Sequence, residues 1–288
     1  MAVKSKFRLT SSAFERKDES EKRQLKKLVF LSVEGSQTEV DYFNLLNCCL
    51  DNSVIKIETL RHLRGDGYSD PENVIELLNE AVDVRENGPF PVDESVAWIL
   101  EKYGSDFIKS YLNKPSSADP IKAKEFKAGL VEAGIDLEYR KHLSDLKSEG
   151  TYFGVVLDRD EKSRPKELLS RCVKRCEEKG YHLFLSNPCF EFFLLLHVCD
   201  VKNTFSQQEL EDFKENRRIS DRHTAASKAL ADRAHHSKKI SGTKFAKYYF
   251  PNIKNGAARA KGFATTFPDL YDNLGTNLFE LFSILGII

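Results

Sequence analysis

The segment GVVLDRDEK, residues 154–162, joins an apolar run to an abrupt acidic end. The run has the composition of a strand buried at the centre of a sheet. Two aspartates one residue apart, Asp158 and Asp160, stand at its tip. Acids at the end of a buried strand are either solvated loop residues or ligands of a cation. The choice between the two depends on what the rest of the chain places beside them.

Similar apolar runs recur along the chain and alternate with segments of helical periodicity. Strands are predicted at 26–35, 53–60, 151–158 and 181–186, with helices at 38–50, from Asp70 and Pro71 onward, and at 165–180. This alternation favours an α/β fold, a parallel sheet flanked by helices. In such sheets ligands bind outside the carboxyl ends of the strands, so a functional site is expected there.

The domain organisation follows from departures from this alternation. Residues 1–25 are polar and charged, and are predicted to form a flexible arm that is either solvated or in contact with an anionic partner. Residues 26–200 form the α/β domain, interrupted at about 88–150 by a helical insertion, and residues 201–288 form a mostly helical region packed on the core. Helices are predicted at 95–112 and 121–148 in the insertion, and at 188–198, 207–215, 221–236, 243–250, 256–263 and 275–286 beyond it.

The composition excludes several classes of protein. With 288 residues, 41% of them hydrophobic, the chain can bury a sizeable core. Its 44 basic and 44 acidic residues cancel, which is compatible with a local basic groove. The six cysteines match neither a small disulfide framework nor a zinc pattern. The amino terminus lacks the apolar core of a signal peptide, and the most apolar run, 190–198, is too short to span a membrane, so we expect a cytoplasmic protein with no membrane partner.

Glu34 gives the two aspartates a partner. It follows the first predicted strand as Asp158 and Asp160 follow the third, so the three acids fall on one edge of the sheet. Residues two apart in an extended segment point to the same side, so both aspartates can face one cation while Arg159 points away. Carboxylates suit Mg²⁺ or Mn²⁺, whereas zinc would be accompanied by a histidine cluster. The alternative is that these strand ends are acidic only because they are wet.

Three motifs around these acids resemble the RloB family, a Toprim-like group associated with bacterial anti-phage and restriction loci. They are VEGSQTEVDYF (33–43), VVLDRDEK (155–162) and LSNPCFEFFLLLH (185–197). The resemblance covers about 27–87 and 151–286, and the third motif is long and specific. The chain departs from the family pattern at Phe193, where a tryptophan is usual, and its insertion is longer than the family suggests.

The resemblance implies roles for individual acids. Glu34 matches the Toprim glutamate, a metal ligand or general acid/base, and Asp158 and Asp160 match the metal-binding pair. Glu39 belongs to the first motif, and either reaches the same edge or only favours the start of its helix. Glu191 lies in the first turn of a helix predicted to begin at 188, where it can serve the metal site or the structure.

Three further residues of the third motif have ordinary structural interpretations. Ser186 and Asn187 are predicted to cap the following helix. His197 lies on an apolar helix, and a buried, hydrogen-bonded histidine is expected there rather than a catalytic one.

Two basic regions are candidates for contact with nucleic acid. The loop after the second strand carries arginines, and residues 215–263 interleave basic and aromatic side chains, as phosphate binding and base stacking require. The alternative is a solvated loop and a charged helical face over an aromatic core. The candidate contacts are Arg61, Arg64, Lys244, Lys247 and Tyr248.

The resemblance therefore implies a Mg²⁺-dependent nuclease that cleaves DNA or RNA, including transfer RNA, in anti-phage defence. It also implies control by a separate ATPase of the ABC or SMC type, since the chain has no Walker motif of its own. One alternative is a non-cleaving module that binds nucleic acid or a nucleotide signal. Another is a primase-like nucleotidyl transferase, which would need a nucleotide pocket and usually a zinc module, neither of which the sequence indicates.

Overall fold

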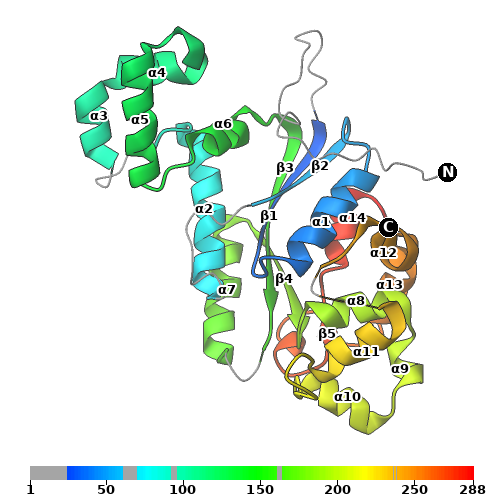
Figure 1. Cartoon of the computed structure of the whole chain (residues 1–288). Helices are drawn as coiled ribbons and strands as arrows, with labels where there is room; N and C mark the ends of the chain where they lie inside the picture. The colour runs from blue at the N-terminus through cyan, green and yellow to red at the C-terminus, as the bar shows by residue number, and fades with distance from the viewer. Residues whose placement is uncertain (1–24, 61–69, 92–95, 161–163, 236, 238) are drawn as a thin grey trace, which may run out of the picture.

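The computed structural model describes residues 25–60, 70–91, 96–160, 164–235, 237 and 239–288. A five-stranded sheet in the order β2-β1-β3-β4-β5 lies at its centre (Figure 1). The first four strands are parallel and β5 is antiparallel to β4, which confirms the predicted α/β fold. The strands are β1 (Leu25–Val33), β2 (Ile55–Thr59), β3 (Ser148–Asp158), β4 (His182–Asn187) and β5 (Gly275–Thr276).

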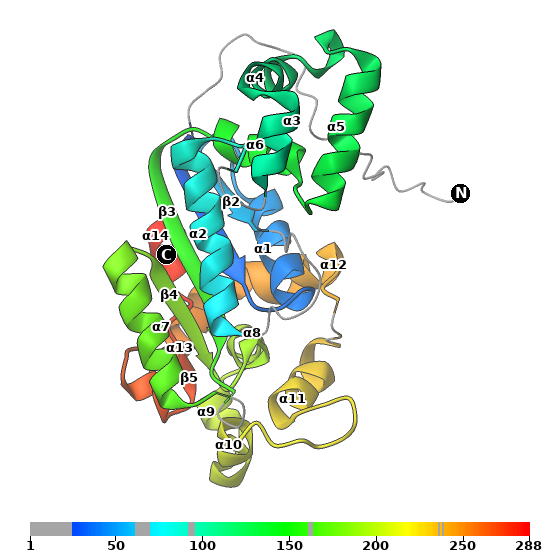
Figure 2. The same cartoon turned by 90° about the vertical axis from the view of Figure 1, so that its left-hand side faces the viewer.

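Helices cover both faces of the sheet, as Figures 1 and 2 show. Successive residues of β1 point to opposite faces. Val29 and Leu31 therefore pack with α1 (Thr38–Cys49) and α8 (Phe190–Val198), whereas Leu28 and Phe30 pack with α2 and α7. Helix α2 spans Pro71–Asn87 and helix α7 spans Lys166–Lys179. Burial on both faces explains why the predicted strands are continuously apolar rather than alternating.

Local sequence signals set the ends of these helices. Asp70 precedes α2, and its carboxylate accepts a 2.9 Å hydrogen bond from the backbone N–H of Glu72, while Pro71 occupies the first helical position. The prediction that a helix begins here is confirmed. Helix α7, on the same face of the sheet as α2, ends before Gly180, which adopts the left-handed conformation with φ of 69°.

The insertion is helical, as predicted, but each of its two predicted helices is split. Gly104, with φ of 78°, separates α3 from α4, and Gly134, with φ of 68°, lies between α5 and α6. The helices are α3 (Ala97–Tyr103), α4 (Ser105–Asn113), α5 (Pro120–Glu132) and α6 (Leu137–Asp145), with a short 3₁₀ turn at Pro115–Ser117. Helices α3 to α5 enclose a small core of their own, and α6 packs against α2.

The carboxyl-terminal region is mostly helical and shares the core on the α1 and α8 side of the sheet. The stretch 275–286, predicted as one helix, instead begins with β5; a two-residue strand leaves no periodicity to detect. Asn277 fixes this region to β4, because its side chain accepts from Leu185 N at 2.7 Å and donates to Leu183 O at 2.9 Å. The remaining elements are α9 (Val201–Thr204), α10 (Gln207–Lys214), α11 (Ala225–Ala234), α12 (Gly242–Lys244), a π-helix (Phe245–Tyr249), α13 (Ile253–Ala260) and α14 (Glu280–Leu285), with short 3₁₀ turns at Phe250–Asn252 and Asp269–Tyr271.

Among the described residues, no helix is both long enough and apolar enough to cross a bilayer.

A candidate acidic site at the carboxyl ends of the strands

Glu34 and Asp158 meet at the carboxyl ends of two adjacent strands. Strands β1 and β3 pair in parallel with Val33 opposite Val156, so the residues that follow them lie side by side. The backbone N–H of Glu34 donates to Val156 O at 3.2 Å, and the backbone N–H of Asp158 donates to Glu34 Oε2 at 3.1 Å. The predicted proximity of the first and third strand ends is therefore present, and it places the Glu34 carboxylate against the main chain of Asp158.

Glu39 reaches this edge from the first turn of α1. Its side chain is only 8% exposed, and its carboxylate lies over Gly35. A Cβ atom at position 35 would come within 1.8 Å of Glu39 Oε2, so any side chain there would push the carboxylate away. The Glu39 carboxylate thus occupies the space that a side chain at position 35 would need.

Glu191 enters from the next strand along the sheet. Helix α8 begins at Phe190 rather than at 188, and Glu191 lies in its first turn, as predicted. The predicted capping by Ser186 and Asn187 is wrong, because both residues belong to β4. Ser186 Oγ lies 2.9 Å from Thr276 Oγ1, and Asn187 Nδ2 donates to Leu270 O at 2.8 Å, so both side chains hold β4 to the carboxyl-terminal region instead.

The charges of these acids interact strongly. Burial raises the pKa of Asp158 well above its usual range, and the nearby carboxylates Glu34, Glu39 and Glu191 raise it further. Burial likewise raises the pKa of Glu39, from 4.5 to about 7, with added repulsion from Glu191 and Glu34. Four carboxylates, two from strand ends and two from helices, therefore share one partly dehydrated region. We refer to Glu34, Glu39, Asp158 and Glu191 as the acidic cluster.

Arg164 is the cation that faces the acidic cluster within the described part of the chain. Its Nη2 forms an ion pair with Glu34 Oε1, and its Nη1 donates to the backbone carbonyl of Asp158. The residue is only 4% exposed. The sequence analysis missed it, because it lies outside the three motifs and nothing in the stretch around it marks an arginine that folds back onto the strand end.

Asp160 departs from the prediction that it and Asp158 lie on one extended segment. Strand β3 ends at Asp158, and Asp160 adopts a left-handed conformation with φ of 30°. Its backbone N–H donates to Pro188 O at 3.1 Å, so the chain turns here. The extended geometry assumed for the pair is therefore wrong, although Asp160 remains next to Arg164. Arg159 does point away, since it is 1% exposed and its Nε donates to Tyr271 O at 2.8 Å.

The donor chemistry of the acidic cluster fits a hard divalent cation. Carboxylate oxygens are the ligands that Mg²⁺ and Mn²⁺ prefer. Burial, and after it the charges of the neighbouring carboxylates, raise the pKa values of Asp158 and Glu39, and a bound cation would offset both effects. In this conformation, however, no group of three or more His, Cys, Asp or Glu side chains among the described residues is arranged to hold a metal ion. The carboxylates are gathered, but they do not form a complete ligand set.

The predicted nucleic-acid contacts divide into two groups. Arg61 and Arg64 lie outside the described residues. Lys244 ends α12 and its Nζ donates to His235 O, while Lys247 is exposed with its Nζ 4.8 Å from the centre of the Tyr248 ring. The π-helix that carries Lys247 and Tyr248 ends at Tyr249, a residue whose pKa is raised by burial and by the charge of Glu191. Tyr249, on the buried side of this segment, therefore lies within electrostatic range of Glu191, whereas Lys247 faces solvent.

His197 is buried and fully hydrogen-bonded, as predicted. Its ring nitrogens lie 3.0 Å from the Phe193 carbonyl and 3.0 Å from the Tyr42 hydroxyl, so Nδ1 donates to the carbonyl and Nε2 accepts from the hydroxyl. Burial lowers its pKa to about 4, which keeps the ring neutral near pH 7. His197 therefore links α8 to Tyr42 of α1 rather than taking part in acid–base chemistry.

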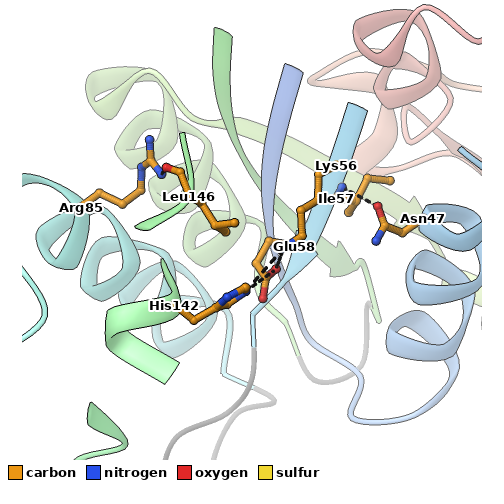
Figure 3. A network of polar contacts seen from close by, with 7 residues as sticks. All are labelled: Asn47, Lys56, Ile57, Glu58, Arg85, His142 and Leu146. Atoms are coloured by element: carbon orange, nitrogen blue, oxygen red, sulfur yellow. Dashed lines mark hydrogen bonds and ion pairs between the residues drawn. The ribbon is translucent and has the colours of Figure 1, made fainter. Parts of the chain in front are cut away.

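A second polar network lies on β2, the edge strand next to β1 (Figure 3). Glu58 Oε2 accepts from Lys56 Nζ at 2.9 Å and from His142 Nε2 at 3.2 Å, which joins β2 to α6 of the insertion. Burial acts to raise the pKa of Glu58, but the His142 hydrogen bond and the Lys56 charge outweigh it and lower the pKa. This network, Lys56–Glu58–His142, is balanced in charge.

Comparison with known proteins identifies one family. The family model described as "RloB-like protein" matches residues 29–285, which includes all four strands of the parallel sheet apart from the first residues of β1, the helical insertion and the acidic cluster. No curated protein and no solved structure shows significant similarity to the chain.

Proposed function

We infer, from the fact that the chain belongs to the RloB-like protein family and from the acidic cluster, that it is a metal-dependent nuclease. Carboxylates gathered at the carboxyl ends of β1 and β3 are the observation that carries this proposal. A ligand site at this edge is what a parallel α/β sheet favours. Four interacting carboxylates do not stabilise a folded core, whereas metal-dependent phosphodiester cleavage needs carboxylates to hold the metal ion.

Glu34, Asp158 and Asp160 are the residues that would hold Mg²⁺ or Mn²⁺, with Glu39 and Glu191 beside them. When bound, such an ion neutralises charge on the phosphate and lowers the pKa of a bound water. Aspartate and glutamate oxygens supply hard ligands, and a ligand set of one or two carboxylates completed by water and phosphate is usual for Mg²⁺. The incomplete protein ligand set agrees with this mode of binding.

Glu39 is suited to move a proton. A pKa of about 7 means that its carboxyl group is partly protonated and partly ionised near neutral pH. General acid–base catalysis is most effective when the pKa of the group lies near the working pH. We assign Glu39 to proton transfer to or from the attacking water or the leaving oxygen, and Glu191 to maintaining the local negative charge that keeps this pKa high.

The substrate of the proposal is DNA or RNA, held by the basic segment that carries Lys244, Lys247 and Tyr248 and by Arg61 and Arg64. Its biological setting is defence against phage, under the control of a separate ATPase. The substrate and its biological setting both derive from the family resemblance. The interaction of Tyr249 with Glu191 supports the part played by the basic segment in holding the substrate.

The test is cleavage by purified protein with Mg²⁺ or Mn²⁺ of plasmid DNA, single-stranded DNA and total transfer RNA. Asp158→Asn removes a charge of the acidic cluster and keeps the side-chain shape, and Glu58→Gln makes the same chemical change in the balanced network. Cleavage by wild type and Glu58→Gln, with none by Asp158→Asn or in EDTA, would support the proposal. Equal cleavage by all three proteins would reject the acidic cluster as the active site.

A non-cleaving nucleic-acid-binding module is the second candidate. It is favoured by one observation, that Arg164 already pairs with Glu34 and so supplies a counter-charge at the position proposed for the metal ion. A binder would retain its affinity for nucleic acid in Asp158→Asn and would show no cleavage with either metal, even when its partner ATPase is added.

A further inference from the structure

Arg164 is held in place by its main chain as well as its side chain. Its backbone N–H donates to Asp160 O at 3.1 Å, and its carbonyl accepts from Arg159 Nη1 at 2.6 Å. The buried Arg159 is itself fixed through the Tyr271 carbonyl, and its backbone N–H donates to Ser186 O at 2.8 Å. The position of the Arg164 guanidinium at the strand ends is therefore built into the fold.

The guanidinium and the main chain together engage both oxygens of the Glu34 carboxylate. Oε1 accepts a hydrogen bond from Arg164 Nη2, and Oε2 accepts one from the backbone N–H of Asp158. The other arm of the guanidinium, Nη1, donates to the Asp158 carbonyl, so one side chain joins the ends of β1 and β3. Glu34 is thus committed to partners within the protein in this conformation.

The charge balance explains why a cation belongs there. Burying carboxylates without a counter-charge is costly, and Arg164 lowers the pKa of Asp158 against the combined effect of burial and three neighbouring acids. A divalent ion at the same carboxylates would supply that compensation more fully. It would also repel the guanidinium at close range.

We propose that Arg164 is a resident counter-cation: it occupies Glu34 while the metal site is empty, and it must release Glu34 when a divalent ion binds. This inference rests on the proposed function, since it concerns the same acids. It assigns Arg164 the role of a competitor of the metal, so that metal affinity is set lower than the carboxylates alone would give. A residue that only positioned Glu34 for the metal would have the opposite effect on affinity.

The test is direct binding of Mn²⁺, measured by the EPR signal of the free ion, without substrate. Arg164→Gln keeps hydrogen-bonding capacity and removes the charge, and is expected to bind Mn²⁺ about tenfold more tightly than wild type because a nearby like charge is gone. Lys166→Gln is the matched control, because Lys166 is an exposed cation two residues away that pairs with Asp272 instead. It is expected to bind Mn²⁺ as wild type does.

Unchanged or weaker Mn²⁺ binding by Arg164→Gln, with normal binding by wild type, would overturn the inference and leave the proposed metal site intact. No binding by either protein would instead reject the metal site, and the inference with it. If Arg164→Gln does not fold, Arg164→Met decides. A methionine removes the charge and keeps an unbranched side chain that can pack in the same place, so tighter binding than wild type is expected, and equal or weaker binding would contradict the inference.

Discussion

The acidic cluster and the Lys56–Glu58–His142 network are two partly buried polar groups on adjacent strands of one sheet, and they differ in the balance of their charges. Glu58 has two basic partners, and its pKa is lowered in spite of burial. Asp158 and Glu39 have acidic neighbours, and their pKa values are raised. The Lys56–Glu58–His142 network stabilises the docking of α6 on β2. The acidic cluster costs stability, which is typical of a site retained for function rather than for folding.

The largest expected effect is on activity. Asp158→Asn is expected to reduce cleavage by about 1,000-fold or more, since it removes a central charge of the proposed metal site. The same substitution should leave the metal-free protein at least as stable as wild type at pH values where Asp158 is ionised, because burial and the neighbouring carboxylates disfavour that ionisation. Single-turnover cleavage and urea unfolding measure the two quantities. A loss of both activity and stability would show that Asp158 is structural.

The pH dependence of stability separates the two groups next. The folded-state pKa of Glu39, about 7, exceeds its usual 4.5, so its contribution to stability is fully present below pH 4.5 and is lost as pH rises through 7. Glu39→Gln has no carboxyl group at this position to ionise, so it is not expected to lose this stability as pH rises. The stability of Glu39→Gln relative to wild type is therefore expected to increase by about 3 kcal/mol between pH 4.5 and 8 in metal-free buffer.

Urea unfolding of the two proteins at a series of pH values measures this difference. A difference that does not change with pH would show that Glu39 titrates normally and is not crowded by Glu34 and Glu191.

Glu58→Gln is expected to lower stability, whereas Glu39→Gln raises it near neutral pH. Loss of the charge leaves Lys56 and His142 without their acidic partner and is expected to lower the free energy of unfolding by about 1–3 kcal/mol near pH 7. Cleavage activity should stay within about twofold of wild type once the protein is folded, because Glu58 interacts with Lys56 and His142 rather than with the acidic cluster. Activity lost in proportion to Asp158→Asn would place the Lys56–Glu58–His142 network in the active site.

The smallest expected effect comes from Gly35→Ala. The new methyl group would displace the Glu39 carboxylate, and cleavage should fall about tenfold, as for a misplaced proton-transfer group, with little change in stability. Gly150→Ala is the matched control, since a Cβ atom there would meet its nearest neighbour, Lys26 O, at an ordinary 3.5 Å. Equal activity of the two variants would remove Glu39 from the mechanism.

The sequence was sufficient to predict the sheet and the two strand ends, those of β1 and β3, that contribute Glu34 and Asp158 to the acidic cluster. Parallel strands place their carboxyl ends on one edge, so Glu34 and Asp158 could be brought together from chain order alone. Glu39 and Glu191 followed from the family motifs and from helical position. Each of these predictions depends on local pattern and on a general rule of topology.

What could not be predicted depends on contacts between distant parts of the chain. Asp160 leaves the extended conformation because its backbone N–H bonds to Pro188 O, and Arg164 lies close enough to the strand end for its backbone N–H to bond to Asp160 O and its guanidinium to pair with Glu34. The capping role assigned to Ser186 and Asn187 failed because β5, from the end of the chain, pairs with β4 and engages Ser186. Neither of these contacts leaves a periodic signal in the sequence.

Calorimetric titration of Mn²⁺ into wild type, Asp158→Asn and Glu58→Gln tests the central claim most directly, since each variant differs from wild type in a single carboxylate. We predict that wild type and Glu58→Gln bind the ion with the same affinity, and that Asp158→Asn loses at least about tenfold in affinity. Equal binding by Asp158→Asn and wild type, or no binding by any of the three, would contradict the assignment of the acidic cluster as a metal site.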